Sequence, residues 1–297
     1  MLPNRTTLAI VYSLVALLLF DLMGLVIKYL SADYSAAELS AYRNICGLIP
    51  SAIALWSSSA WRAAGRRMRL RQWPLAMARG VILTFAQFTF YMSLGLLSFA
   101  TASSITYANA LFMTALAVPL LGEKVGMLRW GAVLIGFAGV MLIVKPGSDA
   151  FTPAALLPLI SALLYALAGV TARMMDDDVP SALINLYSTG VAAIGALGLV
   201  FVTGGFSPLA QISDIAWILA MGGFGGTAVL FLVVSYRMTE QSNLAPFSYF
   251  GIPMAFVLGW IFFDEAPWEE LFPGAILVAF GGLMIVWRER RLRHVNV

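Results

Sequence analysis

Ten long apolar runs constrain this chain more than any other feature of its sequence. Each run holds about 20 residues, the length that an α-helix needs to cross the ~30 Å hydrocarbon core of a bilayer. Continuous runs exclude a membrane β-barrel, whose strands of about ten residues alternate apolar and polar side chains. We therefore predict an all-α integral membrane protein with ten transmembrane helices. The predicted helices cover residues 8–27, 37–56, 73–93, 99–121, 126–144, 152–172, 181–203, 215–236, 243–263 and 270–287.

Composition and the short connections narrow the function. With 61% hydrophobic and 11% charged residues the chain cannot be a water-soluble globule, and its net charge of +3 gives no indication of nucleic-acid binding. The longest connection, residues 57–72, is too short for a soluble catalytic domain. The single cysteine, Cys46, lies in an apolar run, and the single histidine, His294, lies in a basic tail. We therefore expect no enzymatic activity, no metal site and no cofactor.

The distribution of basic residues predicts the orientation of the chain. Cytoplasmic connections of membrane proteins carry more Lys and Arg than the connections on the opposite side. With ten spans both termini share one side, which collects 14 of the 18 basic residues, whereas Lys28 and Lys145 fall on the other side. We therefore expect both termini in the cytoplasm and a location in the inner (plasma) membrane of the cell.

The second half of the chain repeats the first half. When the two halves are aligned through the fourth and ninth apolar runs, Tyr107 pairs with Tyr249 and Glu123 pairs with Glu265. A shift of the alignment by a single position then matches GAVLIGFAGVMLI (131–143) to GAILVAFGGLMIV (274–286).

This repeat divides the chain into residues 1–146 and 147–297, with five predicted helices in each part. Because five is an odd number, the second copy must lie in the membrane upside down relative to the first. Inverted repeats of this kind are typical of transporters, in which the two halves surround a site near the midplane and open it to alternate sides.

Four segments carry a resemblance to a known family. They are YMSLGLLSFATASSI (91–105), LLGEKVGMLRWGAVLIGFAGVMLIV (120–144), SYRMTEQSNLAPFSYFGIPMAFVLGWIFFDEAPW (235–268) and PGAILVAFGGLMIVW (273–287). With these segments the chain resembles the EamA branch of the drug/metabolite transporter superfamily over nearly its whole length. The resemblance implies a ten-helix, inverted-repeat secondary carrier for small metabolites. Amino-acid exporters, including the aromatic-amino-acid type, are among the bacterial members of this family.

Charged and amide side chains inside the apolar runs mark candidate sites, because such groups are costly in lipid unless they face a cavity or a partner helix. Asp21 is a candidate for substrate binding and for proton coupling, and an ion pair with Lys28, two helical turns later, is the alternative. Arg43 and Asn44 could hold a substrate carboxylate, and snorkelling of Arg43 to the interface is the alternative.

The third predicted helix offers two further candidates and one basic residue. Gln87 and Tyr91 lie one turn apart and could bind a ligand or form hydrogen bonds between helices. For Arg79, nearer the start of the same helix, we expect snorkelling to the interface.

Tyrosines form the second group of candidates. The repeat relates Tyr107 to Tyr249, so these two would approach the pseudo-twofold axis and line one cavity, with an interfacial position as the alternative. Other candidates for the same cavity are Asn109, Tyr165 and Tyr187.

Two further features have structural interpretations. We expect Glu123 and Glu265 to stabilise helix N-termini, where a carboxylate complements the helix dipole. The segment MGGFGG (221–226) would let its helix approach a neighbour closely.

These residues favour a small zwitterion as substrate. Few cations lie near the predicted core, which disfavours phosphorylated cargo, whereas tyrosines with one carboxylate and one or two basic groups suit an amino acid with an apolar side chain. With the family resemblance as its main support, the expected function is amino-acid export, including aromatic amino acids, with proton coupling and facilitated diffusion both open. A flippase for lipids or lipid-linked headgroups, or an exporter of another small metabolite or drug, is the alternative.

Overall fold

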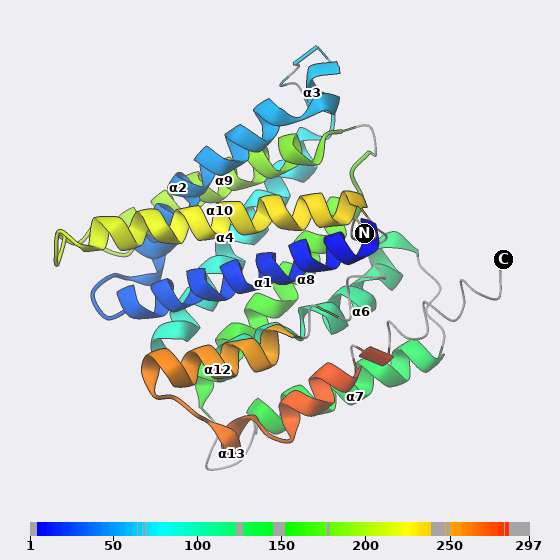
Figure 1. Ribbon diagram of the computed structural model, residues 1–297, viewed down its shortest axis with the longest axis vertical. Coiled ribbons are helices and arrows are strands. Elements are labelled where there is room, and N and C mark those ends of the chain that lie inside the picture. Colours follow the sequence, from blue (N-terminus) through cyan, green and yellow to red (C-terminus); the bar gives the residue numbers. More distant parts are fainter. Residues whose placement is uncertain are drawn as a thin grey trace.

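The computed structural model describes residues 5–63, 65–66, 68, 70–122, 127–144, 152–176, 179–238, 247, 250–281 and 283–284. Within these residues every regular element is a helix (Figure 1). The elements are α1 (Arg5–Leu30), α2 (Ala36–Ser57), α3 (Ser59–Ala63), α4 (Trp73–Leu96), α5 (Phe99–Thr106), α6 (Asn109–Leu121), α7 (Met127–Val144), η1 (Pro153–Ala155), α8 (Leu156–Arg173), α9 (Ser181–Val202), α10 (Asp214–Met238), α12 (Gly251–Phe263) and α13 (Trp268–Leu271). Residues 274–281 are helical as well.

Six of these helical segments are long and apolar enough to cross a membrane. They are Thr7–Leu30, Trp73–Leu96, Phe99–Leu121, Pro153–Ala172, Ala182–Val202 and Asp214–Leu232. The chain is therefore a multi-pass helical membrane protein, as the apolar runs predict. The count of ten spans and the side on which the termini lie stay predictions.

The ends of the helices follow local sequence signals. At the start of α2 the Ser35 side chain accepts a hydrogen bond from the Glu38 backbone N–H, while the Glu38 carboxylate accepts one from the Ser35 N–H at 2.8 Å. This capping box satisfies two donors that the first turn of a helix leaves free. Pro74 stands in the first turn of α4, where its fixed φ suits a helix start.

The predicted helix 99–121 is interrupted in its middle. It consists of α5 and α6, separated by a turn at Tyr107 and Ala108. In helical membrane proteins, backbone that leaves the helical pattern is tolerated where it lines a cavity or is covered by protein. The neighbouring Ile105 and Ala108 are fully buried, so protein covers the backbone at this interruption.

The helices form a bundle in which each half contributes to the packing of the other. α1 lies along α10, and α2 contacts both α9 and α10 (Figure 1). α4 packs against α8 and α9, α6 packs against α8, and α5 packs against α12. The first helices of the predicted halves, α1 and α8, thus lie against helices of the opposite half.

A glycine face on α10 brings α2 close to it. A Cβ atom at Gly225 would come within 3.2 Å of Arg43 Nε and 2.6 Å of Met23 Sδ. Cβ atoms at Gly222 and Gly226 would collide with Cys46 and Pro50 of α2. The expectation that MGGFGG allows a close approach is confirmed, and the neighbour is α2.

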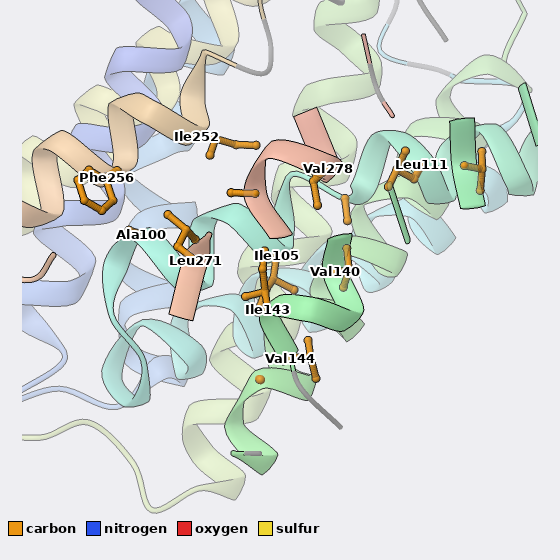
Figure 2. Close-up of a cluster of buried hydrophobic side chains, with 14 of the residues drawn as sticks. Ala100, Ile105, Leu111, Val140, Ile143, Val144, Ile252, Phe256, Leu271 and Val278 are labelled. Carbon is orange, nitrogen blue, oxygen red and sulfur yellow. The ribbon is translucent and has the colours of Figure 1, made fainter. Parts of the chain in front are cut away.

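A second close contact joins α7 to the helix at 274–281. A Cβ atom at Gly139 would lie 2.6 Å from the Gly274 carbonyl oxygen, and one at Gly281 would lie 2.8 Å from Gly136. Around these glycines the buried side chains of both helices form one apolar cluster, in which Val140, Ile143 and Val278 lie together (Figure 2). Inside a bilayer the hydrophobic effect does not drive helices together, because lipid tails are as apolar as the side chains. Small residues let the backbones approach closely, so that van der Waals contact stabilises the pair.

The sequence repeat reappears in the geometry of two helices. α6 and α12 each have 13 residues, and they begin at Asn109 and Gly251, which the alignment of the two halves pairs with each other. Each ends on a left-handed C-cap, Gly122 with φ 66° and Asp264 with φ 54°. The next residues in the sequence are Glu123, which lies outside the described residues, and Glu265.

The glycine face of α10 offers a direct stability test. We expect Gly222→Ala to lower the free energy of unfolding by about 1–3 kcal/mol, because the added methyl group collides with Cys46. Gly223→Ala is the matched control, since a Cβ atom there meets nothing within 4 Å and alanine favours the helix. Thermal unfolding in detergent measures both variants, and equal destabilisation by the two would contradict the packing described.

Candidate functional site

A buried arginine is the centre of the candidate site. Arg43 is the eighth residue of α2, and its side chain is 9% exposed. Its Nη1 donates to the Asn44 Oδ1 at 3.0 Å, and its guanidinium lies against Gly225 of α10. Its Nε is buried and has no hydrogen-bond partner among the described residues. A buried charge with a free donor is costly in an apolar bundle unless an anion approaches it.

Amide side chains join α2 to α4 beside this arginine. Asn44 Nδ2 donates to Gln87 Oε1 at 2.6 Å and to the Ser40 carbonyl oxygen at 2.9 Å. The Ser40 hydroxyl donates to the same Gln87 oxygen at 3.4 Å. The Nδ2 group of Asn44 is thus fixed by two acceptors, and its Oδ1 accepts from Arg43 and orients the guanidinium. The residues predicted separately on two helices form one network.

Two tyrosines lie next to this network. Tyr91, one turn after Gln87 in α4, is 1% exposed and lies within electrostatic range of Arg43. Tyr165 of α8 lies within the same range of both Tyr91 and Arg43. Hydrogen bonds thus join a guanidinium and two amides between α2 and α4, and two phenol rings lie on α4 and on α8, which packs against α4. This combination can bind a carboxylate through hydrogen bonds and an apolar or aromatic group through ring contacts.

A buried acidic group lies on α1, which packs against α10 as α2 does. Asp21 is 5% exposed, and the Tyr107 hydroxyl lies 3.4 Å from its Oδ1. The Tyr107 hydroxyl also lies against Gly251, the first residue of α12. Oδ2 of Asp21 is buried without a hydrogen-bond partner among the described residues. Met23, two residues later on α1, contacts the same Gly225 of α10 as Arg43 of α2 does.

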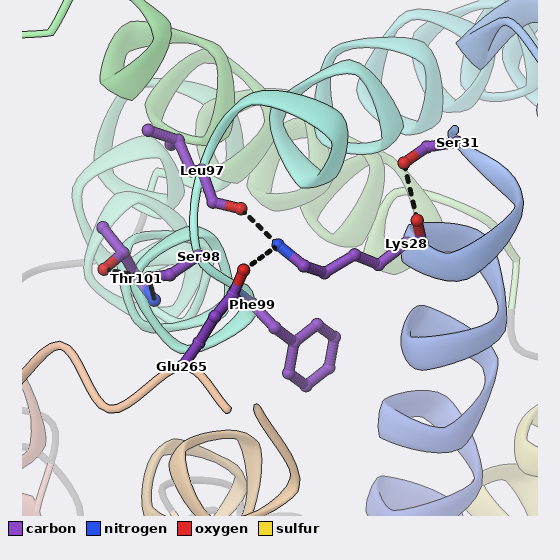
Figure 3. A network of polar contacts seen from close by, with 7 residues as sticks. All are labelled: Lys28, Ser31, Leu97, Ser98, Phe99, Thr101 and Glu265. Atoms are coloured by element: carbon purple, nitrogen blue, oxygen red, sulfur yellow. Dashed lines mark hydrogen bonds and ion pairs between the residues drawn. The ribbon is translucent and has the colours of Figure 1, made fainter. Parts of the chain in front are cut away.

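Lys28 does not pair with Asp21. Its Nζ forms an ion pair with Glu265 Oε1 at 2.9 Å and donates to the Leu97 carbonyl oxygen at 2.7 Å (Figure 3). The alternative of a local ion pair within the first helix is therefore wrong. Residues seven apart share a helix face, but Lys28 reaches across to another helix while Asp21 faces Tyr107.

Glu265 acts at a helix N-terminus, as expected from its sequence position, but the helix is α5. Its Oε2 accepts a hydrogen bond from the Phe99 backbone N–H at 3.0 Å, in the first turn of that helix. A carboxylate there complements the helix dipole. The charge of Lys28 compensates the carboxylate on its other oxygen.

The remaining candidates lie apart from the arginine network or outside the described residues. The Tyr187 hydroxyl donates to the Met68 carbonyl oxygen at 2.7 Å, in the connection between α3 and α4. Asn109 is partly buried at the first position of α6, directly after the turn at Tyr107. Tyr249 lies outside the described residues. Arg79 donates from Nε to the Ala168 carbonyl oxygen at 3.1 Å, and its Nη1 is buried, so this guanidinium reaches α8 rather than snorkelling fully.

Two residues of the site, Ser40 and Gly225, are not predicted as site residues from the sequence, although each has a sequence signal. Ser40 precedes Asn44 by one helical turn, so polar residues recur on one face of an otherwise apolar helix. Gly225 belongs to a glycine-rich segment whose neighbour cannot be read from one sequence. Gly225 lies against the Arg43 guanidinium, and Ser40 accepts a hydrogen bond from the Asn44 amide.

Polar groups between apolar helices, close to an interrupted helix, are typical of membrane carriers. The model of the EamA-like transporter family matches residues 7–145 and 152–287. The chain belongs to this family, and is therefore a small-molecule transporter rather than an enzyme.

Relatives with curated names transport different small molecules. A riboflavin transporter of Rhizobium johnstonii is 26% identical over 97% of this chain and 94% of its own length. A pseudopaline exporter of Pseudomonas aeruginosa is 24% identical over 87% of this chain and 89% of its own length. An S-adenosylmethionine uptake transporter of Rickettsia bellii is 22% identical over 72% of each chain.

A protein of known crystal structure has the same fold. It superposes with a TM-score of 0.65, at 21% identity, and the match covers 96% of this chain and 98% of the other.

The hydrogen bond between Asn44 and Gln87 can be tested by substitution. We expect Gln87→Leu to lower the free energy of unfolding by about 1–3 kcal/mol, because it removes the oxygen that accepts from both the buried Asn44 amide and the Ser40 hydroxyl. Gln87→Glu keeps an acceptor oxygen at the same place and is expected to have the smaller effect. Thermal unfolding in detergent distinguishes the two, and a larger loss for the glutamate variant would contradict this arrangement.

Proposed function

We propose that this chain is a secondary carrier of the plasma membrane that exports amino acids, aromatic ones among them, by alternating access between two inverted five-helix halves. The observation that carries the proposal is the buried Arg43 guanidinium, which is held by Asn44 and whose Nε has no hydrogen-bond partner among the described residues. Tyr91 and Tyr165 lie on α4 and α8, which pack against each other beside it. A substrate carboxylate would supply the missing acceptor and the compensating charge in one group.

A zwitterion suits the arrangement because opposite charges are available on α1 and α2, which both pack against α10. Arg43 of α2 would hold the carboxylate, and Asp21 of α1 would attract the ammonium group. The rings of Tyr91 and Tyr165 would cover the apolar side chain. The turn at Tyr107 places its hydroxyl beside Asp21, where it can donate a hydrogen bond to the ionised carboxylate.

The names of the relatives support a small organic molecule as cargo, and they are compatible with a cargo that contains rings. S-adenosylmethionine carries an α-amino carboxylate, the group that the Arg43 network would recognise. Riboflavin carries an extended ring system, which the tyrosines would accommodate. The named relatives include both uptake and export proteins, so the direction of transport must be measured on this chain.

The cargo can be identified by efflux from proteoliposomes. The vesicles are loaded with the twenty amino acids, riboflavin and S-adenosylmethionine, and the contents are read by mass spectrometry with and without a pH gradient. We expect selective loss of a subset of amino acids that includes the aromatic ones. Loss of riboflavin alone would overturn the amino-acid cargo, and no loss beyond that of protein-free vesicles, from folded protein, would overturn the carrier proposal for all three cargo classes.

Arg43 is the residue whose substitution most affects binding. We expect Arg43→Gln to weaken amino-acid binding about 10- to 100-fold, the range for losing hydrogen bonds to a charged group. Arg43→Lys keeps the charge but loses the planar fork, so an intermediate effect is expected. Arg62→Gln, in the exposed part of α3, removes the same charge away from the site and serves as the control. Equal binding by the parent and Arg43→Gln would remove Arg43 from the site.

Asp21 is the candidate for proton coupling. We expect Asp21→Asn to abolish the acceleration of transport by an imposed pH gradient while leaving downhill exchange, because asparagine cannot take up and release a proton. Asp33→Asn, in the exposed turn after α1, removes the same charge and should leave the pH response unchanged. Unchanged acceleration in the Asp21 variant would assign coupling to another group.

A further inference from the structure

The second polar network of the bundle lies at the end where α1 ends at Leu30 and α2 begins at Ala36, which we call the α1–α2 end. Lys28 and Glu265 meet there, and their side chains are 12% and 31% exposed. Among the described residues, the partners of these two side chains all lie outside the Arg43 network, so binding of the cargo does not account for them.

Three separate parts of the chain converge on this ion pair. Lys28 comes from α1, and its Nζ also donates to the carbonyl oxygen of Leu97, the C-cap of α4. Glu265 follows the C-cap of α12 and accepts from the N–H of Phe99 at the start of α5 (Figure 3). The pair therefore links α1 to α12 and to the connection between α4 and α5 at a single point.

Apolar contacts close the same place. Phe99 is 1% exposed, and its ring fills the space beside Gly24, where a Cβ atom would lie 2.8 Å from its Cε2. The ring of Phe263, at the end of α12, lies 5.3 Å from the Lys28 ammonium group. Side chains of α1, α5 and α12 thus pack together beside the ion pair, and Asp21 and Tyr107 lie further along α1 and at the end of α5.

The other flank of the α1–α2 end is tied separately. The Tyr34 hydroxyl, in the turn after α1, donates to the Asp214 carboxylate at 2.8 Å, and the Ser207 hydroxyl donates to Glu38 at 3.3 Å. These bonds hold α1 and α2 to the connection before α10 and to α10 itself. Separation of α12 from α1 therefore breaks the Lys28–Glu265 pair without disturbing this flank.

We infer that the Lys28–Glu265 ion pair is a latch that keeps the transport pathway closed at the α1–α2 end, and that it opens when α12 moves away from α1. The inference rests on the proposed alternating access. Both charged groups are partly exposed, so water can solvate them after they separate, and the cost of opening stays small. A partly exposed pair suits a contact that must form and break in every cycle.

The latch can be tested by the accessibility of a cysteine at a buried position beside Asn44 and Gln87. Cys46 is the only cysteine in the chain, so Cys46→Ala gives a cysteine-free background. Ser40→Cys then places one thiol at a fully buried position, one turn from Asn44 toward the α1–α2 end. Labelling by a membrane-impermeant thiol reagent, applied to intact cells and separately to inverted vesicles, reports access from each side.

We expect Glu265→Gln and Lys28→Gln each to raise the labelling rate about threefold to fivefold from the side of the α1–α2 end, with no rise from the other side. The double variant should add little to either single change, because both remove the same contact. Lys28→Arg keeps the ion pair and should label at the parental rate. Asp264→Asn is the matched control, since it removes a charge from the exposed neighbour of Glu265.

Parental labelling in both Gln variants, or an equal rise in Asp264→Asn, would overturn the latch. Circular dichroism and the thermal midpoint of each variant show whether it is folded, and if Glu265→Gln unfolds because it also loses the Phe99 N–H bond, Lys28→Gln decides alone. The labelling assay needs no cargo. A failed efflux experiment and a failed latch are therefore distinguishable.

Discussion

Close backbone contact between α2 and α10 determines where the polar groups of this bundle can lie. Gly222, Gly225 and Gly226 remove the side chains that would hold the two helices apart. With α10 so near, the Arg43 guanidinium is enclosed by protein, and Asn44 on the same helix turns toward Gln87 of α4. The apolar surface that remains outside can face lipid, while the charged groups, which would be costly in lipid, are enclosed by protein.

Local sequence patterns predict much of this structure. Apolar runs of about 20 residues predict the helices, because their length is set by the bilayer, and the capping box of Ser35 and Glu38 sets the start of α2. The polar candidates Arg43, Asn44, Gln87 and Tyr91 were identified one helix at a time, since a charged or amide side chain in an apolar run needs a partner. The structure brings these four together between α2 and α4.

Contacts between distant segments could not be derived from the same patterns. Spacing along α1 suggests a pair of Asp21 with Lys28, but Lys28 instead meets Glu265, which belongs to the other half of the chain. The turn at Tyr107 interrupts the helix but not the apolar composition of residues 99–121. Hydrophobicity alone therefore predicts one continuous helix there. Tyr187 resembles the other tyrosines in sequence, yet its hydroxyl lies at the Met68 carbonyl group. Each of these outcomes depends on which segment packs against the residue, and the sequence of one helix does not determine its neighbour.

The central claim is that Arg43 holds the carboxylate of the cargo between α2, α4, α8 and α10. An experimental structure with the transported amino acid bound tests it most directly. The account predicts a carboxylate oxygen within hydrogen-bond distance of Arg43 Nε, with the side chain of the cargo against Tyr91 and Tyr165. A cargo bound elsewhere, with Arg43 still bonded to Asn44 and its Nε unoccupied, would contradict the account.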